Sequence, residues 1–305
     1  MGYLYSLLGA LLFGANGSVT KVVIEGGLTP LQLTQFRVLG CCVIAGAVLL
    51  VVDRSAFRLT RRQLLVMAVL GVFGVAILQA SYAAAIQLLP VGIALLFEYT
   101  AVLFVALIAF LFLHEKVKAR LWVAIVAVLV GLAIVAQVWA SSLNGLGILL
   151  ALLASASLTT YFLVGERQVG ATSPLAVAFW TMLFASVFWA FFSGWWEVTP
   201  AVLIAPTSVG PLWVPLAFNI LFGTFLSFYF SFLALKHLTA TAAGITASSE
   251  VIFAFAVAFL WLGEGLTPVQ LVGAAIVLVG IVLAQTARAN KVVDADLALA
   301  PTLPT

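Results

Sequence analysis

The hydrophobic residues of this chain gather in runs of about 20, separated by short segments that hold most of the charged residues. A helix needs about 20 apolar residues to cross about 30 Å of hydrocarbon, because each residue adds about 1.5 Å to its length. Each run therefore predicts a membrane-spanning helix. Ten spans are predicted, at about residues 2–24, 31–52, 63–88, 90–112, 119–138, 145–165, 174–194, 212–236, 239–262 and 267–287.

The composition favours the same fold class. Hydrophobic residues make up 65% of the chain and charged residues 8%, whereas roughly a quarter of the residues of a soluble domain are charged. No positive residue precedes the first run, whose first charge is Lys21, so we interpret this run as a span and not as a signal peptide. The predicted fold is an all-α integral membrane protein.

The positive charges predict the orientation of the chain. Ten spans place both termini on one side of the membrane, and eleven Lys and Arg residues fall on that side, while Lys21 falls alone on the other. The positive-inside rule therefore predicts that both termini are cytoplasmic. The eleven residues are Arg54, Arg58, Arg61, Arg62, Lys116, Lys118, Arg120, Arg167, Lys236, Arg288 and Lys291.

Two stretches of the chain resemble each other. Residues 89–115 and 238–264 have equal lengths, end on a glutamate and are related by a constant offset of 149 residues. Chance likeness between apolar helices is the alternative to a true repeat, and the shared glutamate favours the repeat. Each predicted half has five helices, an odd number, so the second half enters the membrane from the opposite side. Such inverted repeats place a substrate site near the midplane and rock to alternate its access.

The repeat divides the chain into predicted units. They are a first five-helix repeat over 1–138, a short outer linker over 139–144, a second five-helix repeat over 145–288 and a disordered cytoplasmic tail over 289–305.

Ionisable residues inside predicted spans are candidates for gating or coupling, because charges are costly in a membrane. Arg37 and Glu98 are predicted at similar depths, where they could pair. The alternatives are a structural ion pair that tethers the second span to the fourth, an outer gate, or a clamp for a substrate carboxylate at Arg37. Glu250 is predicted nearer the midplane. It is a candidate for proton coupling or for contact with an ammonium group, and an interhelical hydrogen bond is the alternative.

Polar and aromatic residues at membrane depth are candidates for binding substrate. Their aromatic rings suit an apolar or aromatic side chain, and their hydroxyl and amide groups suit a zwitterionic head group. Simple helix packing is the alternative for each of them. The residues expected to border a cavity are Asn16, Tyr82, Tyr99, Tyr161, Trp180 and Ser248.

Small residues recur in the last predicted span of each half. Gly273 and Gly280 correspond, through the offset of 149, to Ala124 and Gly131. Small residues at this spacing let helices approach closely. We interpret them as packing positions within the chain, and a membrane dimer face is the alternative.

Several short motifs are similar to those of a known family. They are Phe13-Gly14 in the first span, Arg37 in the second, and the helix-ending motifs Leu113-His114-Glu115 and Leu262-Gly263-Glu264. With these motifs the chain resembles, over nearly its whole length, the EamA-domain branch of the drug/metabolite transporter superfamily. The resemblance implies two five-helix halves and transport of small metabolites. The chain departs from the family pattern at Phe13, where Trp is usual, at His114 in place of Gly, and at Ala101, whose counterpart is Glu250.

These observations predict a secondary transporter that exports amino acids, aromatic and other neutral ones, across the bacterial inner membrane. A carrier of organic cations or drugs is the first alternative, and a passive channel or an intramembrane enzyme follows. No cofactor or metal is expected, because Asp53, Asp294 and Asp296 all lie outside the spans and no P-loop or dinucleotide motif occurs. The expected partners are a small amphiphile and the lipid bilayer, with no nucleic acid, and the expected state is a monomer.

Overall fold

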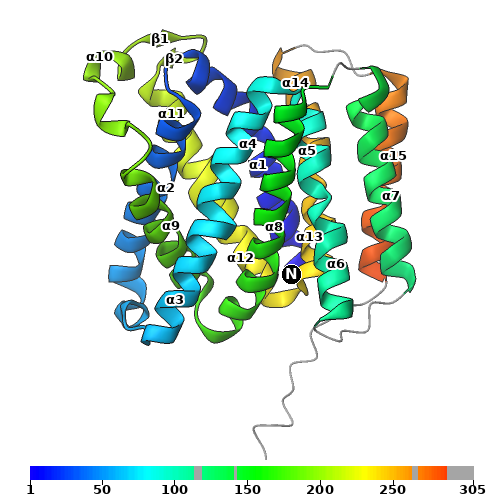
Figure 1. The fold of residues 1–305 in the computed structure, drawn as a ribbon, viewed down its shortest axis with the longest axis horizontal. Helices are drawn as coiled ribbons and strands as arrows, with labels where there is room; N and C mark the ends of the chain where they lie inside the picture. The colour runs from blue at the N-terminus through cyan, green and yellow to red at the C-terminus, as the bar shows by residue number, and fades with distance from the viewer. Residues whose placement is uncertain (113–118, 141–142, 263–266, 287–305) are drawn as a thin grey trace, which may run out of the picture.

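The computed structural model describes residues 1–112, 119–140, 143–262 and 267–286, and in these ranges the chain is almost entirely helical (Figure 1). The motif at residues 113–115, residues Gly263 and Glu264, and the predicted tail over 289–305 lie outside the described residues.

Eight helices among the described residues are long and apolar enough to cross a membrane. Two shorter apolar helices lie at Pro174–Ala190 and Pro268–Ala284. All ten fall on apolar runs that the sequence predicts as spans. The eight long helices are Gly2–Glu25, Pro30–Val52, Arg61–Leu88, Val91–Leu111, Ala119–Ala136, Gly145–Ala171, Trp213–His237 and Ala240–Val257.

Several of these helices are composed of shorter segments. The main elements are α1 (Gly2–Glu25), α2 (Pro30–Val52), α3 (Arg61–Val69), η2 (Leu70–Ala76), α4 (Ile77–Leu88), α5 (Val91–Tyr99), α6 (Ala101–Leu111), α7 (Ala119–Ala136), α8 (Gly145–Ala171), α9 (Pro174–Ala190), α11 (Trp213–Ile220), η5 (Leu221–Leu226), α12 (Ser227–His237), α13 (Ala240–Ala247), α14 (Glu250–Leu262) and α15 (Pro268–Thr286). Short connecting elements are η1 (Arg54–Phe57), η3 (Val138–Ala140), η4 (Trp195–Glu197), α10 (Pro200–Leu203), β1 (Pro206–Thr207) and β2 (Gly210–Pro211).

The helix starts follow from local sequence. Thr29 caps α2 by accepting a hydrogen bond from the Gln32 amide at 3.2 Å, and the Gln32 side chain accepts one from the Thr29 amide at 3.0 Å. Pro30 occupies the first helical position, where its missing N–H costs nothing. Ser173 and Pro174 start α9 in a similar way.

The helices that lead to the site are interrupted at four places, two before residue 138 and two after residue 145. The segments η2 and η5 are π-helical, and they begin at Leu70 and Leu221. A second interruption separates α5 from α6 at Thr100 and α13 from α14 at residues 248–249. Such local departures from α-helical geometry often mark functional sites.

Hydroxyl groups compensate the backbone at the second interruption. Thr100 donates to the Phe97 carbonyl at 2.6 Å, Ser248 to the Ile245 carbonyl at 2.6 Å, and Ser249 to the Thr246 carbonyl at 2.8 Å. Carbonyl groups that lose a helical partner inside a membrane need such a replacement. The interruptions are therefore stable features of the fold.

Two long helices occupy the middle of the bundle. The helix α1 packs against α12, α13 and α14, while α8 packs against α4, α5 and α6. The pair α7 and α15 forms one edge of the molecule in Figure 1, and α2 packs against α9 toward the other edge. The short hairpin β1–β2 lies with α10 at one end of the helices (Figure 1).

The glycines of the last predicted spans lie in the α7–α15 contact. A Cβ atom on Gly131 would lie 2.7 Å from Val277 Cγ2 and 2.9 Å from the Gly273 carbonyl oxygen. A Cβ atom on Gly280 would lie 2.8 Å from Val128 Cγ2. The structure thus confirms that these small residues serve packing within the chain.

Candidate substrate cavity

A cavity of about 70 Å³ lies between α1, α2, α4, α5, α8, α12, α13 and α14. A buried water needs about 10–15 Å³ on this measure, so the cavity has room for about five waters. That space suits the head group of a small metabolite and not a whole aromatic molecule. The cavity is lined by Phe13, Asn16, Gly17, Thr20, Arg37, Leu78, Gln79, Tyr82, Glu98, Tyr99, Leu158, Tyr161, Phe162, Phe228, Ser231, Ala247 and Glu250.

Most of the candidate residues from the sequence meet at this cavity, although they come from six different helices. They are Asn16, Tyr82, Tyr99 and Tyr161 among the candidates for binding, and Arg37, Glu98 and Glu250 among the candidates for gating or coupling. The fold therefore brings Arg37, Glu98 and Glu250, the three candidates for gating or coupling, to one place.

Trp180 and Ser248 do not line the cavity, contrary to the expectation from sequence. Trp180, on α9, donates from its indole nitrogen to the Ala56 carbonyl at 3.0 Å and stacks on Phe184. Ser248 is fully buried and its hydroxyl bonds to the Ile245 carbonyl, so the neighbouring Ala247 reaches the cavity instead. Depth along a helix was predictable for both residues, but the face that each occupies was not.

Arg37 binds the π-helical segment η5 and not Glu98. Its Nε donates to Thr224 Oγ1 at 2.9 Å, and its Nη2 donates to the Gly223 carbonyl at 3.3 Å. No ion pair joins Arg37 to Glu98 among the described residues, so the expected pair is not present here. The guanidinium nitrogen Nη1 has no hydrogen-bond partner in the part of the chain that the structure describes.

Glu250 is held by a tyrosine from the other half of the chain. The Tyr99 hydroxyl lies 2.7 Å from Glu250 Oε2 and 2.9 Å from the Ala247 carbonyl oxygen. Tyr99 ends α5, directly before the first helix break, and Glu250 begins α14, directly after the second. One hydroxyl therefore links the two breaks.

Gln79 lines the cavity although it was not a site candidate from sequence, whereas Glu98 was one. Gln79 is 4% exposed, and neither atom of its amide has a hydrogen-bond partner among the described residues. Glu98 is 8% exposed, and its Oε2 likewise has no described partner. The only signal for Gln79 was a polar side chain in an apolar run, which also fits simple helix packing.

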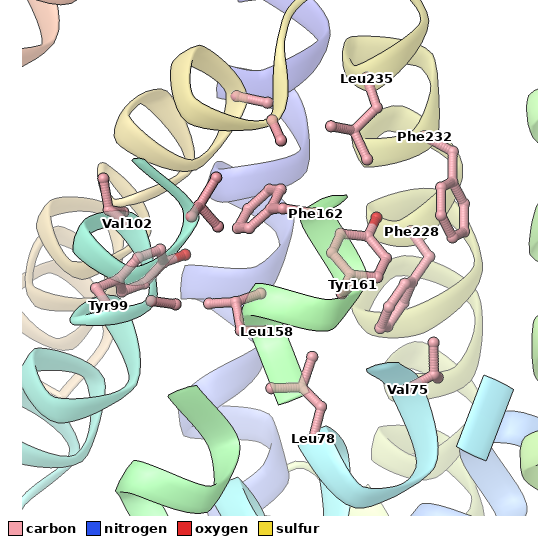
Figure 2. Close-up of a cluster of buried hydrophobic side chains, with 14 of the residues drawn as sticks. Val75, Leu78, Tyr99, Val102, Leu158, Tyr161, Phe162, Phe228, Phe232 and Leu235 are labelled. Atoms are coloured by element: carbon pink, nitrogen blue, oxygen red, sulfur yellow. The ribbon is translucent and has the colours of Figure 1, made fainter. Parts of the chain in front are cut away.

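Aromatic rings form another part of the cavity wall. Tyr161 packs edge-to-face against Phe228 and Phe162, with ring centroids 5.6 Å and 5.4 Å apart. Phe13 packs in the same way against Phe228 at 5.1 Å. Figure 2 shows Tyr161, Phe162 and Phe228 within a larger apolar cluster that extends to Tyr99 and Leu158. The cavity thus combines a charged side with an aromatic side.

A larger space of about 570 Å³, here called the vestibule, lies next to the cavity and shares Gly17 with it. Its inner wall is mainly apolar and includes Val91, Leu95 and Phe255. Lys21 and Glu25 also line it and face each other at 4.0 Å, with both side chains well exposed. The loop of the β1–β2 hairpin contributes residues 208–209, which places the vestibule at that end of the molecule.

Comparison with known proteins gives the family. No curated protein sequence matches the chain. One solved structure, described only as the crystal structure of a protein, superposes with a TM-score of 0.75 at 18% sequence identity, covering 94% of this chain and 96% of the other. The likeness shows a shared fold. The profile of the EamA-like transporter family matches residues 1–137 and 145–286. Since these two stretches span nearly the whole chain, the protein belongs to the EamA-like transporter family of multi-pass membrane proteins, which carry small solutes.

Proposed function

We propose that the protein is a secondary transporter that exports amino acids, aromatic and other neutral ones, and similar small metabolites across the bacterial inner membrane. The observation that carries the proposal is the cavity, where one guanidinium, two carboxyl groups and an aromatic wall surround a single small space. A zwitterion with an apolar side chain offers the complementary groups: a carboxylate for Arg37, an ammonium for a glutamate and a side chain for the rings.

The two cavity volumes suggest how such a substrate lies. The cavity of about 70 Å³ has room for the amino and carboxyl groups of an amino acid. The vestibule of about 570 Å³ has room for its side chain, against Val91 and Phe255. We propose that the head group occupies the cavity and that a large side chain extends past Gly17 into the vestibule.

Alternating access by two inverted five-helix halves is the proposed mechanism. The corresponding positions of η2 and η5, and of the two helix breaks, support a repeat. The α7–α15 contact supports it further. The offset of 149 residues relates Ala124 to Gly273 and Gly131 to Gly280. Gly131 meets Gly273 while Gly280 meets Ala124, so exchanging the halves leaves this set of contacts unchanged.

The proposed orientation has ten spans and both termini in the cytoplasm, and the proposed working unit is a monomer. On this orientation the vestibule, which includes Lys21 and residues 208–209, opens toward the periplasm. A whole-chain resemblance to the bacterial amino-acid exporter YddG, which exports aromatic amino acids and some cationic compounds, supports the substrate class, although no single motif carries that closer likeness.

Counterflow in proteoliposomes tests the proposal. The purified chain is reconstituted with an internal amino acid, and uptake of labelled amino acids, an organic cation and a sugar phosphate is followed with and without a pH gradient. We expect saturable uptake of aromatic or neutral amino acids that an internal substrate accelerates. Linear flux without acceleration would indicate a channel, and no exchange over a broad amino-acid panel would reject the amino-acid assignment.

A carrier of organic cations is the second candidate function. It is favoured by the balance of charge at the cavity, where two carboxyl groups accompany one guanidinium that already binds η5. Preferential exchange of the organic cation in the same experiment would support this candidate. A sugar phosphate is disfavoured, because a dianion calls for more than one cationic group.

A further inference from the structure

Two side chains that line the cavity have buried polar atoms without a described partner. These atoms are Glu98 Oε2 and both amide atoms, Oε1 and Nε2, of Gln79. Exchanging the oxygen and nitrogen of the Gln79 amide leaves one acceptor and one donor unpaired on that side chain. Glu98 and Gln79 therefore supply two oxygen acceptors with unused hydrogen-bonding capacity.

These two acceptors are deeply buried. The exposed fractions are 8% for Glu98 and 4% for Gln79. Buried polar groups in proteins nearly always have a hydrogen-bond partner, and a buried carboxylate without one is costly. A ligand that donates several hydrogen bonds and carries a positive charge would satisfy both together.

The two cavity glutamates differ in their availability. Glu250 already accepts a hydrogen bond from Tyr99 at 2.7 Å, which fixes its position between the two helix breaks. Glu98 has no such bond at Oε2, and no ion pair reaches it among the described residues. Glu98 is thus the carboxyl group whose hydrogen-bonding capacity is not used by the described parts of the chain.

We propose that Glu98, with the amide oxygen of Gln79, forms a subsite that requires N–H donors from the substrate, so that the protein selects primary ammonium compounds over quaternary ones. The inference rests on the proposed function and deepens it by naming the substrate head group. A primary ammonium has three N–H bonds, which is enough to donate to both oxygens. A quaternary ammonium can still stack on the aromatic wall through cation–π attraction, but it leaves these oxygens unsatisfied.

A graded series of ligands tests the proposal on the unmodified full chain. Phenylalanine and its N-methyl, N,N-dimethyl and N,N,N-trimethyl derivatives are titrated into the detergent-purified protein by calorimetry, with 3-phenylpropionate as the analogue that lacks nitrogen. We expect affinity to fall at each step and by about tenfold or more for the trimethyl compound, as the loss of charge-assisted hydrogen bonds requires. Equal affinity for phenylalanine and its trimethyl derivative would overturn the proposal.

The variant Glu98→Gln separates hydrogen bonding from steric exclusion, and Glu197→Gln, an exposed glutamate outside the cavity, is the matched control. In Glu98→Gln the preference for phenylalanine over its trimethyl derivative should narrow by about tenfold, whereas Glu197→Gln should keep it. A preference that persists unchanged in Glu98→Gln would assign the selectivity to size and overturn the role of Glu98. If no member of the series binds while an unrelated solute exchanges in counterflow, both the subsite proposal and the amino-acid assignment fail.

Discussion

At the level of single residues, the ionisable groups of the cavity perform three different tasks. Arg37 binds the carbonyl of Gly223 and the hydroxyl of Thr224 in η5, so it holds a helix segment in place while facing the cavity. Glu250 is fixed by Tyr99, and Oε2 of Glu98 has no hydrogen-bond partner within the described ranges of the chain. Their shared location follows from the fold, but their roles follow from these individual partners.

Glu250 is the candidate for proton coupling. Its carboxyl group can bind and release a proton, whereas the amide of the variant Glu250→Gln cannot. We expect Glu250→Gln to lower counterflow by at least about tenfold, which corresponds to about 1.4 kcal/mol, and to flatten its dependence on pH. Other titratable groups line the cavity, namely Arg37, Glu98, Tyr82 and Tyr99, and all of them are retained in Glu197→Gln. The pH profile of Glu250→Gln is therefore compared with the profile of Glu197→Gln. Wild-type rate and wild-type pH dependence in Glu250→Gln would show that the coupling role is wrong.

Gly17 lies where the cavity and the vestibule meet. A Cβ atom there would lie 3.9 Å from Tyr82 Oη and 3.9 Å from Val91 Cγ1, which is ordinary van der Waals contact. We expect Gly17→Ala to transport nearly normally and Gly17→Leu to fold but lose most transport, because the longer side chain fills the passage. Counterflow rate and thermal midpoint are measured together. Normal transport by Gly17→Leu would place the substrate path elsewhere.

At the level of elements, the site depends on where helices depart from α-helical geometry. The π-helical segment η5 presents Gly223 and Thr224 to Arg37, and Gly223 lets the Asn16 side chain lie against its backbone. The segment η2 ends at Ala76, whose carbonyl accepts a hydrogen bond from the Trp189 indole at 3.0 Å. Residues of neighbouring helices therefore stabilise both segments.

The packing of α7 on α15 gives a test of stability. A Cβ atom on Gly131 would approach Val277 and the Gly273 carbonyl within 3 Å, whereas one on Gly170 would have nothing within 4 Å. We expect Gly131→Ala to destabilise the protein by about 1–3 kcal/mol through overpacking. Gly170→Ala should be neutral or slightly stabilising, because alanine favours a helix. Thermal unfolding in detergent measures both, and equal midpoints would contradict the close contact.

The sequence predicted the positions of the apolar helices well and the cavity only in part. Runs of about 20 apolar residues are a strong signal for membrane helices, and all ten predicted runs correspond to apolar helices. A π-helical segment adds a residue to a turn and rotates everything beyond it. Counting residues along α4 or α12 therefore cannot tell which face carries Gln79 or Ser231. Trp180 was misplaced for a related reason, since its face depended on the packing of α9.

At the level of the whole molecule, the proposed orientation can be checked with single cysteines. Cys41 and Cys42 are buried and are first replaced. Ser208 is exposed beside the vestibule, and Ser55 is exposed in the arginine-rich segment after α2. We expect a membrane-impermeant maleimide to label Ser208→Cys in intact cells and Ser55→Cys only after permeabilisation, because the positive-inside rule puts the arginines in the cytoplasm. The opposite pattern would invert the topology.

The hydrogen bond between Tyr99 and Glu250 also bears on the ancestry of the chain. Through the offset of 149 residues, Tyr99 corresponds to Ser248 and Glu250 corresponds to Ala101. Two copies of the first half would hold two tyrosines and no partner carboxyl at this position, and two copies of the second half would hold the carboxyl without the tyrosine. If the proposed repeat arose from a duplicated half, neither half alone can rebuild this bond, so a symmetric homodimer of half-length subunits would lose it.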